Sequence, residues 1–220
     1  MRELEPTVFI VDSDTRTLKS LQALFESVRL RAEIYLSAED FFRSYDRARP
    51  GCLILEVRLP RIGGIEVQRR MRAARSDLPV IFLTGHGDLT TAVTAMRDGA
   101  FDFLEKPPIE QYLLDRVQTA VAQDRERRRH DAARDAAAAR LRALSPREIE
   151  VVNHLLEGKT SKGISRALGI GLKTVDFHRA NIMRKMGVET AVELVYLLVK
   201  AGYSPEGPLG PAPARSPIPL

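Results

Sequence analysis

The sequence has one cysteine, no tryptophan and no long apolar segment. A single Cys52 excludes an intrachain disulfide, and its position within an apolar strand pattern predicts a buried, reduced thiol. No apolar run approaches the roughly 20 residues that a helix needs to cross a bilayer. Residues 1–6 carry no basic-then-apolar export signal. We therefore expect a cytoplasmic protein without a membrane partner.

An acidic excess is also absent, because 34 Lys and Arg residues outnumber 29 Asp and Glu residues. Acidic and basic side chains nearly balance through residue 123, so the net charge of +5 arises in the second half of the chain. A polyanion such as double-stranded DNA is therefore expected to bind there. A chain of 220 residues is long enough for two small domains.

The first half alternates short apolar runs with amphipathic helical spacing. Runs at 8–11, 32–35, 52–55, 80–83 and 101–104 predict five strands. Several runs are apolar throughout, which is typical of a parallel sheet covered on both faces. This order predicts an α/β domain.

Chemistry in open α/β sheets gathers at the carboxyl ends of the strands. Asp12, Glu56, Thr84 and Lys106 each follow or end such a strand, and we expect them to share one crevice. Carboxylates suit a hard cation such as Mg²⁺, while a lysine and a hydroxyl can hold the oxygens of a phosphoryl group. The sequence shows no pair of nucleophile and base at a spacing suited to catalysis, so we do not expect an enzyme.

Four motifs resemble the receiver domain of two-component response regulators. They are Val-Asp-Ser-Asp at 11–14, Leu-Glu-Val-Arg-Leu-Pro at 55–60, Thr-Gly-His-Gly-Asp at 84–88 and Phe-Leu-Glu-Lys-Pro at 103–107. The likeness is greatest to FixJ-like members, which carry a LuxR-type helix-turn-helix. It implies a five-stranded parallel sheet of flavodoxin-like order 2-1-3-4-5, followed by an all-α four-helix domain.

Two positions depart from what this resemblance implies. Ser13 replaces the second of two adjacent acids, and Glu56 stands where the family has its phosphoacceptor aspartate. Asp14 lies one residue farther on and is not assumed to replace the missing acid. The remaining metal ligands would be Asp12, Glu56 and the backbone of Arg58. We therefore expect no resident cofactor and, at most, weak Mg²⁺ binding.

Glu56 is longer than aspartate by one carbon bond, about 1.5 Å. Phosphoryl transfer depends on in-line positioning, so we expect no phosphorylation there. The longer side chain would instead reach toward Thr84 and Lys106 and hold an active-like state. The other interpretation is a degenerate acid in a receiver that serves as a dimerisation scaffold. Phe103 occupies the family's aromatic switch position. The alternative interpretation, that Phe103 is an ordinary aromatic residue of the core, stays open.

A helical pattern without proline or glycine runs over 109–144. Its arginine-rich part at 124–130 is interpreted as a solvated helix face rather than a DNA contact. Ser145, Pro146 and Glu148 then give a capping box with proline at the first helical position. We predict a receiver-like domain at 6–122, a helical linker at 123–140, a DNA-binding domain at 141–203 and a disordered Pro-rich tail at 204–220.

The segment 173–186 is predicted to be the recognition helix. Val175, His178, Ile182 and Met186 share the face that should dock it. The family resemblance implies base contacts from Asp176, Phe177 and Ala180. The full predicted DNA-binding set is Lys173, Thr174, Asp176, Phe177, Arg179, Ala180, Asn181, Arg184 and Lys185. The apolar last helix at 190–201 indicates a dimer seam.

We interpret the chain as a sequence-specific transcription regulator of the two-component type, acting as a homodimer and independently of aspartyl phosphorylation. One alternative is a conventional phosphorelay response regulator controlled by a sensor histidine kinase. Another is an interaction module whose receiver binds a protein partner or small molecule.

Overall fold

The computed structural model describes residues 5–85 and 87–203. The chain divides into two compact units, with the division after Arg128. The predicted Pro-rich tail at 204–220 lies outside the described residues. Across those two described stretches, no helix combines the length and the apolar character needed to cross a membrane.

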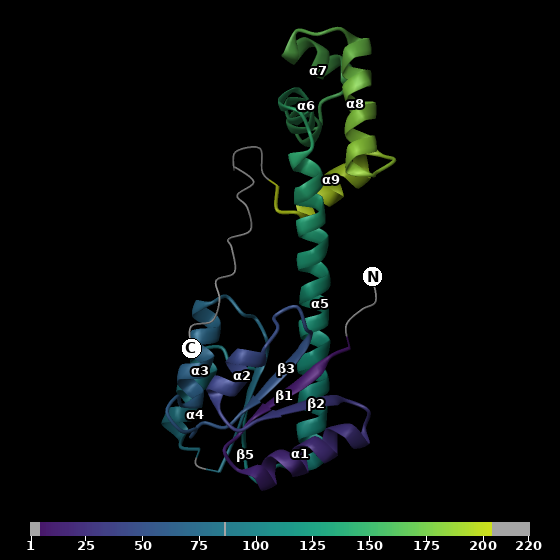
Figure 1. Cartoon of the computed structure of the whole chain (residues 1–220). Helices are drawn as coiled ribbons and strands as arrows, with labels where there is room; N and C mark the ends of the chain where they lie inside the picture. Colours follow the sequence, from purple (N-terminus) through teal and green to yellow (C-terminus); the bar gives the residue numbers. More distant parts are fainter. Residues whose placement is uncertain (1–4, 86, 204–220) are drawn as a thin grey trace. The chain divides into compact units, whose positions relative to one another are not determined.

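A five-stranded parallel sheet forms the centre of the N-terminal unit (Figure 1). Its order, β2-β1-β3-β4-β5, confirms the order that the family resemblance implied. The observed strands lie within one residue of the predicted ones at each end. They are β1 (Thr7–Val11), β2 (Arg31–Tyr35), β3 (Gly51–Leu55), β4 (Val80–Thr84) and β5 (Asp102–Glu105).

Helices cover both faces of the sheet (Figure 1). Along β3, Cys52 and Ile54 pack with one helical layer, while Leu53 and Leu55 pack with the other. This alternation is the period of two that a strand imposes. The first layer is formed by α1 (Thr15–Ser27) and by the first part of α5 (Glu110–Arg142). The second layer contains α2 (Ala38–Ser44), α3 (Gly64–Ala73) and α4 (Leu89–Arg97).

Cys52 is fully buried and free, as predicted. Burial raises the pKa of its thiol far above the ordinary value, because the low dielectric of the core disfavours the thiolate. Since the thiolate is the nucleophile, Cys52 is chemically inert.

Asp124 fastens α5 to the N-terminal edge of β3. Its buried carboxylate accepts from the Gly51 N–H at 3.0 Å and pairs with Arg127 at 2.5 Å and Arg128 at 2.6 Å. The Arg128 guanidinium also donates to the Arg49 carbonyl at 3.0 Å. The interpretation of this arginine-rich run as a solvated face was therefore wrong at Arg127 and Arg128. Folding brings the loop before β3 to Arg128 and brings Asp77, before β4, to Arg127, which their local sequence does not indicate.

The C-terminal unit is helical, as predicted. Ser145 and Glu148 form the expected capping box, with the Ser145 N–H 2.7 Å from Glu148 Oε2. Gly169 ends the helix at Ser161–Leu168, and its backbone adopts the left-handed region at φ 64°. The helices after α5 are α6 (Pro146–Leu156), α7 (Ser161–Leu168), α8 (Leu172–Met186) and α9 (Ala191–Lys200).

The predicted docking face of α8 is largely confirmed. Val175, Ile182 and Met186 are fully buried in the core of this unit. His178, which was expected to face inward with them, is only half-buried, and its ring lies beside that of Phe177, with 5.9 Å between centroids. It sits at the boundary of the buried stripe, where a polar ring can keep contact with water.

Candidate functional site

Asp12, Glu56, Thr84 and Lys106 meet at the carboxyl edge of the sheet. Asp12 directly follows β1 and Glu56 directly follows β3, while Thr84 ends β4 and Lys106 follows β5. Parallel strands bring these positions to one edge, and the predicted shared crevice is confirmed by the contacts between the side chains. Glu56 is only 7% exposed, and Asp12 and Thr84 are also buried.

Both carboxylate oxygens of Glu56 have partners. Thr84 Oγ1 donates to Glu56 Oε1 at 2.5 Å, and the Arg58 N–H donates to the same oxygen at 3.2 Å. Lys106 Nζ donates to Glu56 Oε2 at 2.6 Å and also to Asp12 Oδ2. The side chain therefore spans from the hydroxyl to the ammonium group, the two groups toward which it was expected to reach.

These contacts shift the ionisation of both partners. Burial acts to raise the pKa of Glu56, but hydrogen bonds from Lys106 and Thr84 outweigh it and hold the pKa below its ordinary value. Burial acts to lower the pKa of Lys106, but bonds to Asp12 and Glu56 outweigh it and raise the pKa. Each partner thus favours the charged form of the other.

Asp14 caps a helix with its carboxylate, while its backbone N–H donates to Asp12 Oδ1 at 2.9 Å. Its carboxylate accepts from the backbone N–H groups of Arg16 and Thr17 at the start of α1, and from the Thr17 hydroxyl at 2.8 Å. The hydrogen bond from the Thr17 hydroxyl is the main reason why the pKa of Asp14 lies below its ordinary value. Ser13, at the position of the second acid, is exposed. Among the residues that the structure describes, no three His, Cys, Asp or Glu side chains cluster as metal ligands.

Phe103 packs inward from β5. It is half-buried, and its ring centroid lies 5.9 Å from that of Phe82. Gly87 lies directly against the ring, since a Cβ there would come within 2.8 Å of it. The Lys106–Pro107 peptide after this strand is cis.

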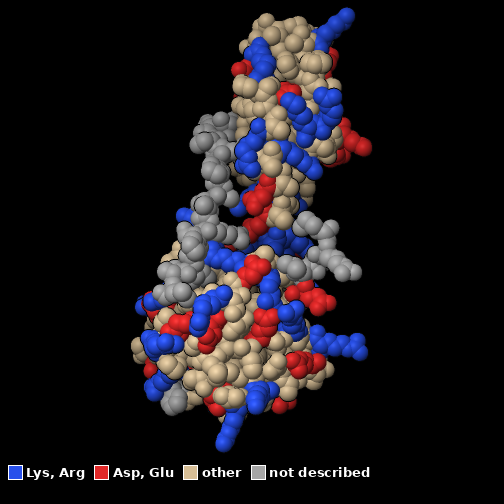
Figure 2. All heavy atoms as spheres, in the orientation of Figure 1, with Lys and Arg blue, Asp and Glu red and all other residues tan. Residues whose placement is uncertain are grey.

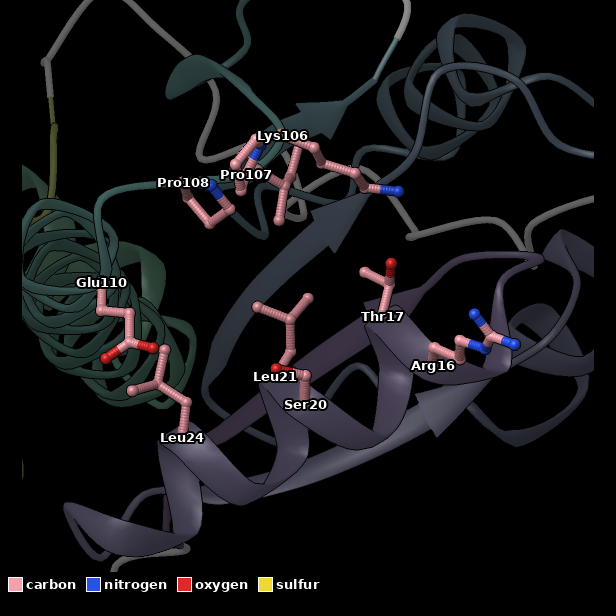
Figure 3. A pocket seen from close by; sticks show the side chains of 10 residues that line it. Arg16, Thr17, Ser20, Leu21, Leu24, Lys106, Pro107, Pro108 and Glu110 are labelled. Carbon is pink, nitrogen blue, oxygen red and sulfur yellow. The ribbon is translucent and has the colours of Figure 1, made fainter.

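A pocket of about 440 Å³ adjoins the acid cluster between α1 and the start of α5. Figure 3 shows Leu21 rising from α1 toward the segment that carries Lys106 and Pro107. Lys106 therefore belongs both to this pocket and to the network around Glu56. The other lining residues are Arg16, Thr17, Ser20, Leu24, Leu83, Pro108 and Glu110.

Along α8, an exposed face lies opposite the buried stripe. Phe177 is 62% exposed, which is unusual for a large aromatic side chain. Lys and Arg side chains stand out on the visible face of the C-terminal unit (Figure 2). The exposed residues of the predicted DNA-binding set are Lys173, Thr174, Asp176, Phe177, Ala180, Arg184 and Lys185.

Three cations of the predicted set have intramolecular partners. Arg179 donates to Ser161 Oγ at 2.8 Å, which ties α8 to α7. Arg184 donates to Asn181 Oδ1 at 3.0 Å along α8 itself. Lys185 Nζ lies 2.7 Å from Glu148 Oε2, which ties the end of α8 to α6.

Glu148 is the residue of this unit whose full role the sequence reasoning missed. Its carboxylate is buried and accepts from both the Ser145 N–H and Lys185. Burial acts to raise its pKa, but the Lys185 hydrogen bond and the capping contacts hold that pKa below its ordinary value. The capping-box pattern identified Glu148 locally, but no sequence signal linked it to Lys185, which is 37 residues away.

Comparison with known proteins identifies both units. Residues 8–118 match the response regulator receiver domain, and residues 142–198 match the bacterial regulatory proteins of the luxR family. The chain is 36% identical over 195 residues to the transcriptional regulatory protein FixJ of Bradyrhizobium diazoefficiens, covering 89% of this chain and 95% of that protein. It belongs to the two-component response regulators.

Two further likenesses span most of this response regulator. The transcriptional regulatory protein TdiR of Thauera aromatica is 34% identical over 212 residues, which cover 96% of this chain and 93% of that protein. The solved structure of the response regulator StyR is 36% identical with a TM-score of 0.83, covering 89% of this chain and 99% of that one. The family comprises transcription regulators with a LuxR-type DNA-binding domain and is not an enzyme class.

Proposed function

We propose that this response regulator binds double-stranded DNA through α8 and that its receiver works without aspartyl phosphorylation. The observation that carries the proposal is the position of Glu56, which is bonded to Thr84 and Lys106 at the same time. A hydroxyl and an ammonium group are the donors that would otherwise hold phosphoryl oxygens. Glu56 brings its own carboxylate oxygens to both donors.

The same contacts oppose phosphoryl transfer to Glu56. An attacking carboxylate oxygen must be free and in line with the leaving group. Oε1 accepts from Thr84 and from the backbone of Arg58, while Oε2 accepts from Lys106. Attack through Oε1 would require one of its two hydrogen bonds to break, and attack through Oε2 would use an oxygen already engaged by the Lys106 ammonium group. The shift caused by the longer side chain adds to both obstacles.

Magnesium fits this donor set poorly. Asp12 and Glu56 both accept from Lys106, so an ammonium group already occupies an oxygen of each carboxylate that a cation would need and offsets one of their two negative charges. Ser13 supplies no carboxylate, and Asp14 is engaged in capping α1. A hard divalent cation requires several oxygen ligands. These side chains therefore do not fit a resident divalent cation.

We further propose that Glu56 holds the receiver in an active-like state. A carboxylate carries one negative charge, whereas a phosphorylated side chain carries about −1.5 to −2, so the mimicry is partial. What supports it is the retention of the complete set of contacts to Thr84 and Lys106. In the scaffold alternative, the network would contribute to stability but not to DNA binding.

Radiolabelled acetyl phosphate tests independence from phosphorylation. The unchanged chain should incorporate no label, whereas the double variant Ser13→Asp plus Glu56→Asp should become labelled because it regains both family acids. Glu56→Gln is the control for labelling elsewhere, since an amide cannot accept the phosphoryl group. Equal labelling of the unchanged chain and the double variant would contradict the proposal and favour a conventional regulator of a sensor histidine kinase.

We propose that two copies pair through α9 on DNA. Val192, Tyr196 and Val199 are between 62% and 79% exposed, and their spacing places them on one side of the helix. An exposed apolar stripe of this kind is typical of an association surface. A dimer would present two copies of α8 to two half-sites. Such a regulator would act where bacterial DNA lies, in the cytoplasm.

A second candidate function rests on the pocket beside Lys106. A small anionic ligand in this space could compete with Glu56 for the ammonium group while packing on Leu21 and Leu24. Thermal unfolding with a panel of aliphatic and aromatic carboxylates tests this function. Stabilisation of the unchanged chain but not of Ser20→Trp, which narrows the pocket, would support it; no stabilisation by any carboxylate would contradict it.

A further inference from the structure

Arg140, near the end of α5, contacts the C-terminal end of α8. Its Nη1 donates to the Met186 carbonyl at 2.7 Å. Met186 is the last residue of α8, and the final carbonyls of a helix have no partner within the helix. The N–H groups of Gly187 and Val188 bond the carbonyls of Arg184 and Met183. Arg140 therefore supplies a donor at an end of α8 where positive charge is favourable.

Gly187 makes this approach possible. It adopts φ +66°, a left-handed conformation that glycine tolerates best. A Cβ at this position would lie 3.0 Å from Arg140 Nη1, which is closer than ordinary packing allows. The residue thus ends α8 and leaves room for the guanidinium group.

The residues around Arg140 also belong to the C-terminal unit. Leu141 is buried in the hydrophobic core that contains Val175, Ile182 and Met186 of α8. Ala137, one turn earlier, is buried as well. The compact unit begins at Arg129, whereas the match to the luxR family begins at residue 142. The last turns of α5 are therefore structural parts of the unit that carries α8.

We propose that Arg140 is a positioning residue for DNA binding. By holding the C-terminal end of α8, it fixes the helix that presents Lys173, Asp176 and Phe177. The DNA-binding module accordingly begins within α5, before residue 142. This inference rests on the proposed use of α8 to bind DNA. Because Arg140 is itself exposed, a direct phosphate contact is the competing role that an experiment must separate.

The test uses the full chain and a duplex that the unchanged chain selects from a random-sequence pool. Arg140→Met keeps much of the apolar stem but removes the donor and the charge. Arg134→Met on the same helix removes an equal charge from an exposed side chain whose Nε lies 4.0 Å from Asp135 Oδ1. We expect Arg140→Met to bind the selected duplex about three- to tenfold more weakly than Arg134→Met, as for the loss of one typical hydrogen bond.

Salt dependence separates positioning from direct contact. Loss of a phosphate contact lowers the slope of log affinity against log salt by about 0.9. For a positioning residue, we expect an unchanged slope and a larger loss on the selected duplex than on a random duplex. A slope lowered by about 0.9 relative to Arg134→Met would overturn the proposal, as would equal affinities of the two variants.

Amide hydrogen exchange gives a readout without DNA. The Gly187 and Val188 N–H groups should exchange faster in Arg140→Met than in Arg134→Met, because the end of α8 loses its restraint. Arg140→Lys should restore part of the protection and part of the affinity, since an ammonium group can still donate to the Met186 carbonyl. It also covers the case in which Arg140→Met does not fold, because weaker DNA binding by Arg140→Lys without any loss of protection at Gly187 and Val188 would then overturn the positioning role.

Failure of the proposal differs from failure of the DNA-binding function. If the unchanged chain selects no duplex, the use of α8 to bind DNA is contradicted. If the unchanged chain selects a duplex but Arg140→Met behaves like Arg134→Met, only the role of Arg140 is overturned.

Discussion

Lys106 Nζ lies 2.6 Å from Glu56 Oε2 and also donates to Asp12, so one ammonium group holds two buried carboxylates. The contact joins residues 50 positions apart and closes the carboxyl edge of the sheet. In a partly buried site, such a network is sensitive to the loss of any one member, because the remaining charges stay buried without compensation.

Lys106→Met should destabilise the protein strongly. It leaves the carboxylates of Asp12 and Glu56 buried without their shared cation, a change that costs about 3 kcal/mol. Lys19→Met, which removes an exposed lysine of α1, should change stability by no more than about 0.5 kcal/mol. Urea unfolding at neutral pH measures both. Equal stability of the two variants would show that the network contributes little.

Stability should fall on acidification through Glu56. Because its pKa in the folded protein lies below the ordinary value of 4.5, its stabilising contribution is present above pH 4.5 and is lost as the pH falls through the folded pKa. The raised pKa of Lys106 gives a contribution that is present below pH 10.5 and is lost as the pH rises through its folded pKa.

Glu56→Gln isolates the acidic effect. Between pH 7 and about pH 3.5, the unchanged chain should lose more unfolding free energy than Glu56→Gln, which has no proton to gain at this position. Urea unfolding at the two pH values gives the comparison. A loss of the same size in both proteins would contradict a depressed pKa at Glu56.

Glu56→Gln should also weaken binding to a selected DNA duplex if Glu56 maintains an active-like state. The amide keeps the length of the side chain but removes the charge that pairs with Lys106. Glu105→Gln, at an exposed position at the end of β5, is the matched control. Fluorescence anisotropy should reveal about a fivefold or greater loss for Glu56→Gln alone, equivalent to about 1 kcal/mol. Affinities equal to the control would favour the scaffold alternative.

Lys173 and Phe177 should affect DNA binding in different ways. Lys173→Ala should lower the slope of log affinity against log salt by about 0.9, as expected for one lost phosphate contact. Phe177→Ala should leave the slope unchanged but reduce preference for the selected duplex, because an apolar ring can contact thymine methyl groups. If neither variant changes binding, α8 is not the recognition helix.

Tyr196→Asp should prevent pairing through α9, because it places a charge in the middle of the exposed apolar stripe. Val28→Asp makes a similar change at an exposed apolar position in the N-terminal unit. Sedimentation velocity should detect a monomer for Tyr196→Asp at concentrations where Val28→Asp is a dimer. A dimer in both cases would assign the pairing surface elsewhere.

Much of the fold could be predicted because its signals are local. Alternating apolar runs gave the strands within one residue at each end, and the capping box at Ser145 gave the start of α6. The acid cluster was also predictable, since parallel strands necessarily bring their carboxyl ends to one edge. These inferences needed only neighbouring residues or the order of the elements.

The choice of partners was not predictable in the same way. Arg128 looked solvated within a charged run, yet it bonds the carbonyl of Arg49, 79 residues away. Arg140 bonds Met186 at a separation of 46 residues, and Lys185 bonds Glu148 at 37. Each of these arginines and lysines has several possible acceptors, and the sequence does not rank them.

The sequence alone determined the order of elements, the residues at the sheet edge and the two departures at Ser13 and Glu56. Only the tertiary structure decided that Glu56 reaches both Thr84 and Lys106, and that Arg140 reaches the end of α8. The physical reason is that helix and strand signals arise from short-range sterics and periodic burial. A hydrogen bond between distant side chains exists only after packing has fixed both ends within about 3 Å.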